Sequence, residues 1–202
     1  MATMLFPALM AIIFLACLAF VYQEGMWGAA LRLINTVTAA LIATAYYETL
    51  ANYLDGQLES YTYAWDFLSL WAVFAVCMIV FRLMTDRLSK VKVRFLKIVD
   101  QIGSGVLAVL VGCVFVSFTL FTLHTAPLAK NFMGGGFDNE QKMLLGTAPD
   151  RQWESFVRSR SKNGYETDPV NAFDPHGQWR DRYEARRAEI ENHVTRSKTL
   201  RK

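Results

Sequence analysis

The sequence has few of the residue patterns that usually carry enzyme chemistry. It contains three histidines, with no HExxH pattern, no closely spaced pair of cysteines and no phosphate-binding loop. A hydrolytic triad needs a nucleophile, a base and an orienting acid that meet in space. One histidine, His124, ends an apolar stretch, and the other two lie in a polar tail. We therefore expect no catalytic residues, no cofactor and no bound metal ion.

Other absences exclude further classes of protein. No Asp or Glu lies at the centre of an apolar stretch, which disfavours a stand-alone carrier coupled to protons or ions. A formal net charge of +3, without a basic stripe interleaved with aromatics, argues against nucleic acid. The cysteines Cys17, Cys77 and Cys113 all lie in apolar stretches, where thiols usually act as small apolar residues.

Long apolar runs are what the sequence does have. Hydrophobic residues make up 53% of the chain and the mean hydropathy is +0.20. A bilayer core of roughly 30 Å needs about 20 apolar helical residues to cross it. Stretches of about this length, apolar nearly all round, are Leu5–Tyr22, Ala29–Tyr46, Phe67–Met84 and Ile102–Leu123.

This pattern predicts an all-α fold. We expect a four-helix transmembrane bundle with a small helical or partly disordered C-terminal tail. Residues 1–125 would form the membrane domain, and residues 126–202 an extramembrane tail with two short amphipathic helices. One helix would start near Pro149-Asp150, and a charged helix would run from about Gln178 to Arg196. Because the tail has a thin apolar face, we expect it to lie on the membrane, pack on a partner or remain partly mobile.

The connectors between the spans carry opposite charge. The segment Tyr47–Asp66 holds acidic residues and no Lys or Arg, and we expect these acids to be solvated. The connector between the third and fourth spans is basic and holds Arg82, Arg87, Lys90, Lys92, Arg94 and Lys97. The positive-inside rule places this basic connector in the cytoplasm and both chain termini outside. Its basic residues can also contact lipid headgroups.

Polar and small residues within two spans are candidate sites. Arg32, Asn35 and Thr36 lie in the second span, where an ionisable group is a functional hypothesis by default. We expect Arg32 to snorkel to the headgroups instead, because it lies close to the end of its span. In the last span, small residues predict a close contact between helices, in the manner of small-xxx-small motifs. The residues concerned are Ser104, Gly105, Ala108 and Gly112.

The order of these features resembles the colicin V production protein (CvpA) family of bacterial inner-membrane proteins. The resemblance covers about residues 5–125. The family's last span often reads Asp-x-x-x-Gly-x-x-x-Gly-x-x-Arg-Gly, and Asp100 and Gly112 match its ends. Its middle glycines fall on Ser104 and Ala108, and its Arg falls on Val111.

What this resemblance implies is a role rather than a reaction. We expect a non-enzymatic multi-pass inner-membrane protein that supports toxin production, secretion or envelope homeostasis. Two alternatives stay open. The chain could be a subunit of an oligomeric pore or transporter, lined by Asn35, Thr36, Thr38 and Thr44. It could also be an anchor whose tail binds an envelope or secretion partner. Membrane lipid and a second copy of the chain are the other expected partners.

Overall fold

A computed structural model describes residues 5–57, 63–88, 96–128, 147–161, 173–174 and 176–199. Within these ranges the chain is all-helical, as the sequence predicts. The helices are α1 (Leu5–Tyr22), α2 (Gly25–Asp55), α3 (Trp65–Leu88), α4 (Lys97–Thr125), α5 (Pro149–Arg160) and α6 (Trp179–Thr199). The first four helices are long and apolar enough to cross a membrane.

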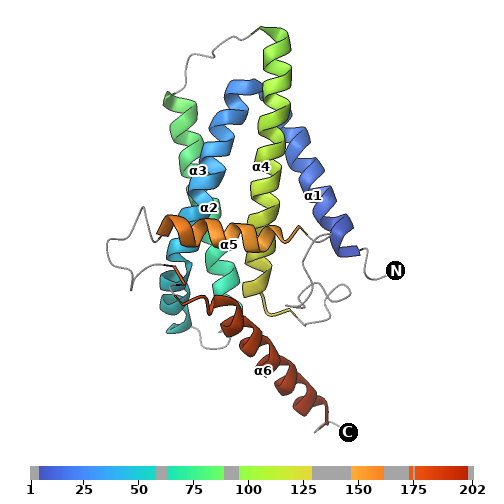
Figure 1. Ribbon diagram of the computed structural model, residues 1–202. Coiled ribbons are helices and arrows are strands. Elements are labelled where there is room, and N and C mark those ends of the chain that lie inside the picture. The colour runs from blue at the N-terminus through green and yellow to red at the C-terminus, as the bar shows by residue number, and fades with distance from the viewer. Residues whose placement is uncertain are drawn as a thin grey trace.

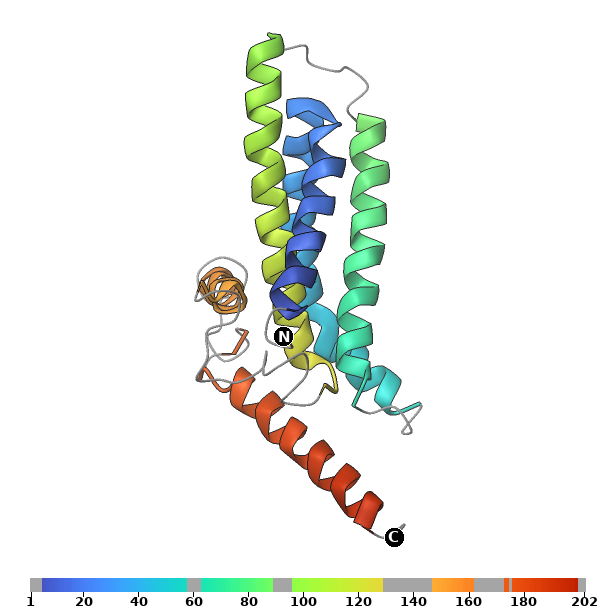
Figure 2. The same cartoon turned by 90° about the vertical axis from the view of Figure 1, so that its right-hand side faces the viewer.

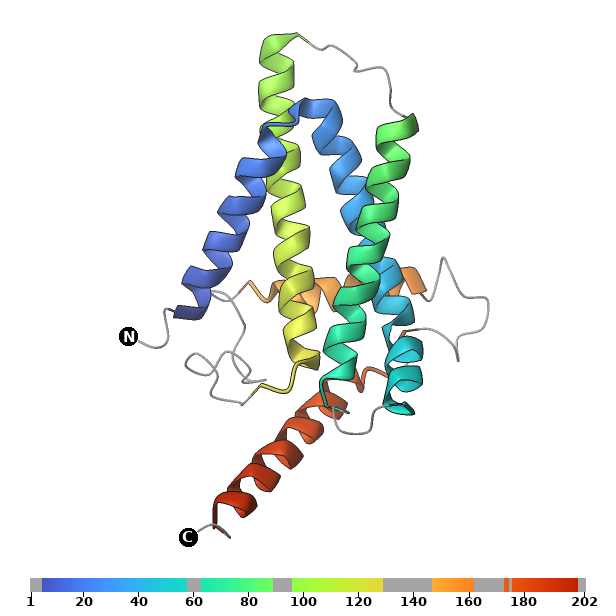
Figure 3. The same cartoon turned by 180° about the vertical axis from the view of Figure 1, so that it is seen from behind.

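The four long helices run alternately up and down in one bundle (Figure 1). The start of α1, the end of α2, the start of α3, the end of α4 and the two tail helices lie at one end, which we call the tail end. The α1–α2 turn, the end of α3 and the start of α4 lie at the other end, the connector end (Figure 3). Four antiparallel spans therefore place the start of α1 and the end of α4 on the same side.

The α1–α2 turn is tight because of one glycine. Only Gln23 and Glu24 separate the two helices, and Gly25 has a φ of +75°. This left-handed conformation is easily reached by glycine, which has no Cβ. The turn reverses the chain within two residues, so the first two spans form a hairpin.

Helices α2, α3 and α4 are longer than the apolar runs that predicted them, whereas α1 matches its run. Helix α2 continues through Tyr47 to Asp55, a segment that we expected to be a connection. Its extra turns carry Tyr47 and Ala51 into buried positions beyond the apolar run. Helix α4 begins at Lys97, within the basic connector, and has Asp100 in its first turn, where a negative charge favours the helix dipole.

Small residues allow the helices of the bundle to approach closely. Ala39, Ala40 and Ala43 on α2 have no exposed surface. They share one apolar cluster with Leu70 on α3 and Phe118 on α4. In contrast, the apolar side chains of α1 are largely exposed, as expected of a span that faces lipid.

The tail packs on its own bundle, which corrects our expectation. Helix α5 crosses the bundle almost at right angles, and α6 starts beside it and slopes away from the tail end (Figures 1 and 2). Trp153 and Val157 of α5 and Trp179 and Tyr183 of α6 join the same apolar cluster as the spans. The expected thin apolar face is sufficient because it completes an existing core instead of building one.

Candidate functional site

The most polar part of the described interior lies where the tail meets the bundle. We call this region the tail junction. It combines the ends of α2 and α4 and the start of α3 with both tail helices. Its polar members are Tyr47, Glu48, Asp66, His124, Asp150, Glu154, Arg180, Arg182, Tyr183, Arg186 and Arg187, with the indole of Trp179 among them.

A buried ion cluster joins α4 to the tail helices. Nε2 of His124 lies 3.1 Å from Oδ2 of Asp150, and Nη2 of Arg180 lies 3.0 Å from the same oxygen. Arg180 also donates through Nε to Glu154 at 2.6 Å. Arg187, itself buried, donates to the backbone carbonyl of His124 at 3.0 Å. Because a buried charge is costly unless it is paired, this cluster specifies where α5 and α6 sit.

The charge of Asp150 is stabilised by its neighbours. Burial by itself would raise the pKa of this carboxyl, but the hydrogen bond from His124 and the nearby charge of Arg180 outweigh it. The pKa is therefore lowered from its ordinary value of 3.8. An ionised Asp150 accepts, so Nε2 of His124 carries the proton that is shared between them.

Aromatic hydroxyls link α6 to α2 and α3. The indole Nε1 of Trp179 donates to the hydroxyl of Tyr47 at 2.8 Å, and Tyr47 donates to Glu48 at 2.9 Å. Tyr183 donates to Asp66 at 3.0 Å. Burial and the neighbouring carboxylate of Asp66 raise the pKa of Tyr183, so its hydroxyl keeps its proton as a donor. Trp179 also stacks on Phe121 of α4, with ring centroids 4.3 Å apart.

Two acids at the tail end are paired instead of solvated. Glu48 accepts from Arg182 at 2.7 Å, and Asp66 pairs with Arg186. This differs from the expected solvated acids, because the basic side of α6 lies directly over them. Asp55, by contrast, has one buried carboxylate oxygen without a hydrogen-bond partner among the residues that the structure describes.

Asp174 organises the start of α6. Its Oδ1 accepts the backbone N–H groups of Gln178 and Trp179 at 2.7 and 3.1 Å, which satisfies amides that a helix start leaves free. Its other carboxylate oxygen, Oδ2, accepts from Arg158 at the end of α5, at 2.5 Å. One side chain thus joins the two tail helices.

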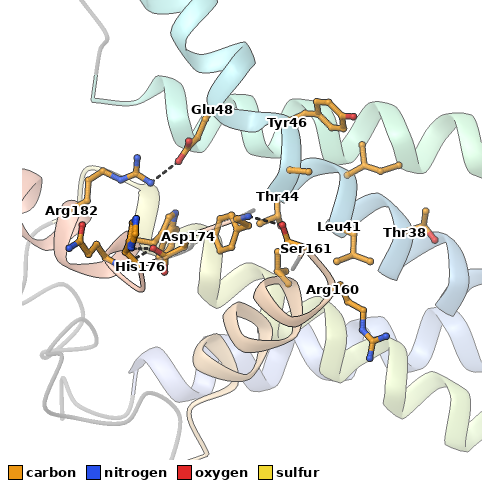
Figure 4. A pocket seen from close by; sticks show the side chains of 16 residues that line it. Thr38, Leu41, Thr44, Tyr46, Glu48, Arg160, Ser161, Asp174, His176 and Arg182 are labelled. Carbon is orange, nitrogen blue, oxygen red and sulfur yellow. Dashed lines mark hydrogen bonds and ion pairs between the residues drawn. The ribbon is translucent and has the colours of Figure 1, made fainter. Parts of the chain in front are cut away.

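A cavity of about 880 Å³ opens beside this junction, between α2 and the tail helices. Its α2 wall includes Thr38, Leu41 and Ala45. Figure 4 shows Arg160 beside Thr38 and Leu41, while Asp174, His176 and Arg182 gather at the opposite end. The cavity therefore has an apolar wall along a span and polar groups from the tail, as is usual for small-molecule sites.

At the connector end, Asp100 binds the α1–α2 turn. Its Oδ1 accepts the backbone N–H of Met26 at 2.9 Å, in the first turn of α2. Glu24, the residue before that helix, makes no side-chain capping bond, so Asp100 caps α2 from a different helix. A Cβ at Gly25 would lie 3.4 Å from the same carboxylate. The motif residue Asp100 therefore contacts both the glycine of the α1–α2 turn and the first turn of α2.

The proposed packing residues of α4 face other helices of the same chain. Ser104, Ala108 and Gly112 are buried, and Ala108 clusters with Val21 and Ala29. A Cβ on Gly112 would come within 2.8 Å of the ring of Phe14, so this glycine allows the close approach of α1. Gly105 lies in a looser position, where a Cβ would be 3.9 Å from the ring of Tyr22.

The polar residues of the second span have local partners. Arg32 pairs with Glu24 in the α1–α2 turn, at the connector end. Asn35 donates to the hydroxyl of Thr85 on α3 at 3.2 Å, and Thr36 donates to the carbonyl of Arg32 at 2.8 Å. Arg32 is thus an ion-paired residue near the membrane surface, a pairing that our headgroup interpretation did not include.

The connector residues are only partly within the described ranges. Arg82 lies 3.7 Å from Asp86 in an exposed pair, and Arg87 and Lys97 are exposed at the connector end. Lys90, Lys92 and Arg94 lie outside the described residues.

Sequence reasoning missed the tail junction. His124, Asp150 and Trp179 were not among the predicted site residues, although one signal was available. The acidic Tyr47–Asp66 segment and the basic tail have complementary charge, which favours contact between them.

The arrangement serves to hold helices together. In the described contacts, Arg180 pairs with Asp150, and Arg187 donates to the backbone carbonyl of His124 at the end of α4. Neither arginine is a nucleophile. Among the described residues, no group of three His, Cys, Asp or Glu is placed to hold a metal ion.

The comparisons with known proteins agree with the membrane bundle. Residues 7–140 match the family model described as Colicin V production protein. The match includes all four spans and extends beyond the end of α4 into the first part of the tail. No curated protein and no solved structure matches the chain.

Proposed function

We propose that this chain, which belongs to the family of colicin V production proteins, is a non-enzymatic scaffold of the bacterial inner membrane. It would support toxin production or secretion, or envelope homeostasis. The four spans would hold it in the bilayer, and the docked tail would present a fixed surface on one side.

The tail junction is the observation that supports this proposal. The residues best suited to acid–base chemistry, His124 and Asp150, are buried and occupied in joining α4 to α5 and α6. Such a cluster favours a rigid platform over a reaction centre. The far part of α6 extends away from the bundle, which favours an envelope partner for the tail as a second function (Figure 2).

The pore alternative has less support. Thr36 and Thr44 each donate to a carbonyl one turn earlier in the same helix, at 2.8 and 2.7 Å. Asn35 is bonded to Thr85. Thr36 and Thr44 are also almost fully buried, so the packing around them would have to open before they could line a water-filled path.

We place both termini outside the cytoplasm. Arg32, Arg82 and Arg87 belong to the connector end, which supports a cytoplasmic position for it. Four basic residues of the tail, Arg158, Arg180, Arg182 and Arg186, are paired with acids of the same chain, which reduces the positive charge that the tail presents. A phosphatase reporter fused after Lys202 should be active outside the cytoplasm. Cytoplasmic activity of that fusion would overturn the orientation.

Reconstitution distinguishes the scaffold from a pore. We expect liposomes with the purified protein to show the same solute flux as empty liposomes. In cells that lack the gene, the wild-type chain should restore toxin export or envelope resistance. Solute flux that is present with the wild type and vanishes with Thr36→Leu would show that the protein forms a pore, and would overturn the scaffold proposal. If a chain lacking residues 133–202 restored the phenotype as well, the tail would not be needed for the function.

A further inference from the structure

The cavity beside the tail junction has the features of a site for a single lipid. One wall is the membrane-spanning helix α2, with Leu41, Ile42 and Ala45 facing the space. Val157 and Phe173 add apolar surface from the tail side. Its volume of about 880 Å³ lies within the roughly 300–1,000 Å³ that ligand pockets usually enclose.

The height of the cavity matches the surface of the bilayer. Helix α1 is apolar along its length and exposes large side chains such as Leu5, Ile12 and Leu15, so lipid must surround it to its N-terminal end. Helix α5 lies at about the same height as that end (Figures 1 and 3). The end of α5 that lines the cavity is therefore in the interfacial region, where phospholipid headgroups lie.

The charges around the cavity favour an anion. Two acids line it, and each is neutralised within the protein, Glu48 by Arg182 and Asp174 by Arg158. Arg160 also lines the cavity and pairs with no carboxylate among the described residues. Among the described residues, its guanidinium lies over the ring of Phe156, 5.7 Å from the ring centroid. An exposed guanidinium at this depth is well placed to bind a phosphate, to which it can donate two parallel hydrogen bonds.

We propose that this cavity binds one anionic phospholipid, with its phosphate on Arg160 and an acyl chain along Leu41, Ile42 and Ala45 of α2. The lipid would fill the space between the span and the tail helices. It would thereby make the docked position of the tail dependent on the anionic lipid of the membrane.

The test measures lipid binding to the purified full-length protein in detergent. Phosphatidylglycerol and phosphatidylcholine are titrated separately and bound lipid is counted by native mass spectrometry. We expect phosphatidylglycerol to bind at least about fivefold more tightly, the preference that one basic residue near an anionic headgroup supplies. Arg160→Gln should remove this preference by weakening phosphatidylglycerol binding more than phosphatidylcholine binding, because the phosphate of phosphatidylcholine is already balanced by its own choline.

Two further variants locate the site. Ala45→Phe places a ring in the acyl-chain path from an exposed position of α2, and should weaken binding of both lipids. The matched control is Arg151→Gln, which removes the same charge from α5 at a residue that does not line the cavity, and should bind as the wild type does.

Several results would overturn the proposal. Equal affinity for the two lipids in the wild type would do so, as would equal losses in Arg160→Gln and Arg151→Gln. Competition with inorganic phosphate tests whether the acyl chain contributes to binding. If millimolar phosphate alone displaced phosphatidylglycerol completely, the site would bind a free anion, and the acyl-chain path would have no role.

Discussion

Single carboxylates hold this protein together at both ends. Asp100 joins α4 to the α1–α2 turn, and Asp150 joins the tail to the end of α4. Asp174 joins α5 to α6. Each carboxylate accepts from groups on another element, so one side chain fixes the relative position of two helices. The contribution of such a residue depends on whether its partners would otherwise stay unsatisfied.

Asp100→Ala should lower the free energy of unfolding by about 1 kcal/mol, the usual cost of losing a helix cap. The physical reason is that the N–H of Met26 loses its acceptor. Thermal unfolding in detergent, followed by tryptophan fluorescence, measures the effect. Asp86→Ala is the control, because that carboxylate is exposed on α3 and makes only a 3.7 Å pair with Arg82. Equal losses in the two variants would show that the cap contributes nothing.

Asp150→Asn should destabilise the docked tail by about 2 kcal/mol at neutral pH, since a hydrogen bond to a charged group is lost. The effect should depend on pH in a defined direction. The pKa of Asp150 is lowered in the folded protein, so its ionised form adds stability above pH 3.8, and that stability is lost as the pH falls through the folded value.

Unfolding of both proteins over a pH series checks this sign. The difference between wild type and Asp150→Asn should shrink as the pH falls below about 4, where the wild-type carboxyl becomes protonated. Asp181→Asn, at an exposed acid of α6, should show no such pattern. A difference that did not shrink below about pH 4 would mean that the ionised form of the carboxyl is not what stabilises the docked tail.

At the scale of helices, α4 is the element that the others share. It packs on α1 through Gly112 and Phe14, on α2 through Ala108 and Ala29, and on α5 through Phe118 and Trp153. Val111, which stands where the family often has Arg, is buried in the cluster of Ala108. An apolar residue suits that place, because a charge there would need a partner.

Ala108→Leu should lower stability by about 1–3 kcal/mol, as expected when a larger side chain enters a filled contact. Ala108 has no exposed surface, and its neighbours Val21 and Ala29 lie on two different helices. The neighbouring Val109→Leu is the matched control, because Val109 is 40% exposed on the lipid side. Thermal unfolding in detergent compares them. If Ala108→Leu changed only the oligomeric state, these small residues would serve contacts between chains instead.

The spans could be predicted from the sequence because each helix in lipid must satisfy its own backbone and present apolar residues all round. The extension of α2 to Asp55 could not, since its polar residues become stable only under the tail. The Trp179–Tyr47 bond joins positions 132 residues apart, and no local pattern indicates such a pairing. Asp100 could be picked out through the resemblance, but its partner is a backbone N–H, which no residue type identifies.

At the scale of the whole molecule, the tail and the bundle behave as one folding unit. The main apolar cluster includes side chains from α2, α3, α4, α5 and α6. At the tail end, next to this cluster, the acids Glu48 and Asp66 pair with the arginines of α6. Complementary charge of this kind selects one docked position more than it adds stability, because exposed pairs contribute little and half-buried pairs contribute more.

A double-mutant cycle tests this distinction across the junction. Asp66→Asn, Arg186→Gln and the double variant should give a coupling free energy of about 1 kcal/mol, since the side chains of Arg186 and Asp66 are only 26% and 15% exposed. The more exposed pair of Glu48 and Arg182 provides the matched cycle, and its coupling should be at most about 0.5 kcal/mol. Hydrogen exchange of the α6 amides measures both cycles, because undocking exposes that helix to solvent. Zero coupling between Asp66 and Arg186, with unchanged exchange in each single variant, would mean that the apolar contacts of Trp179 and Tyr183 dock the tail without help from charge.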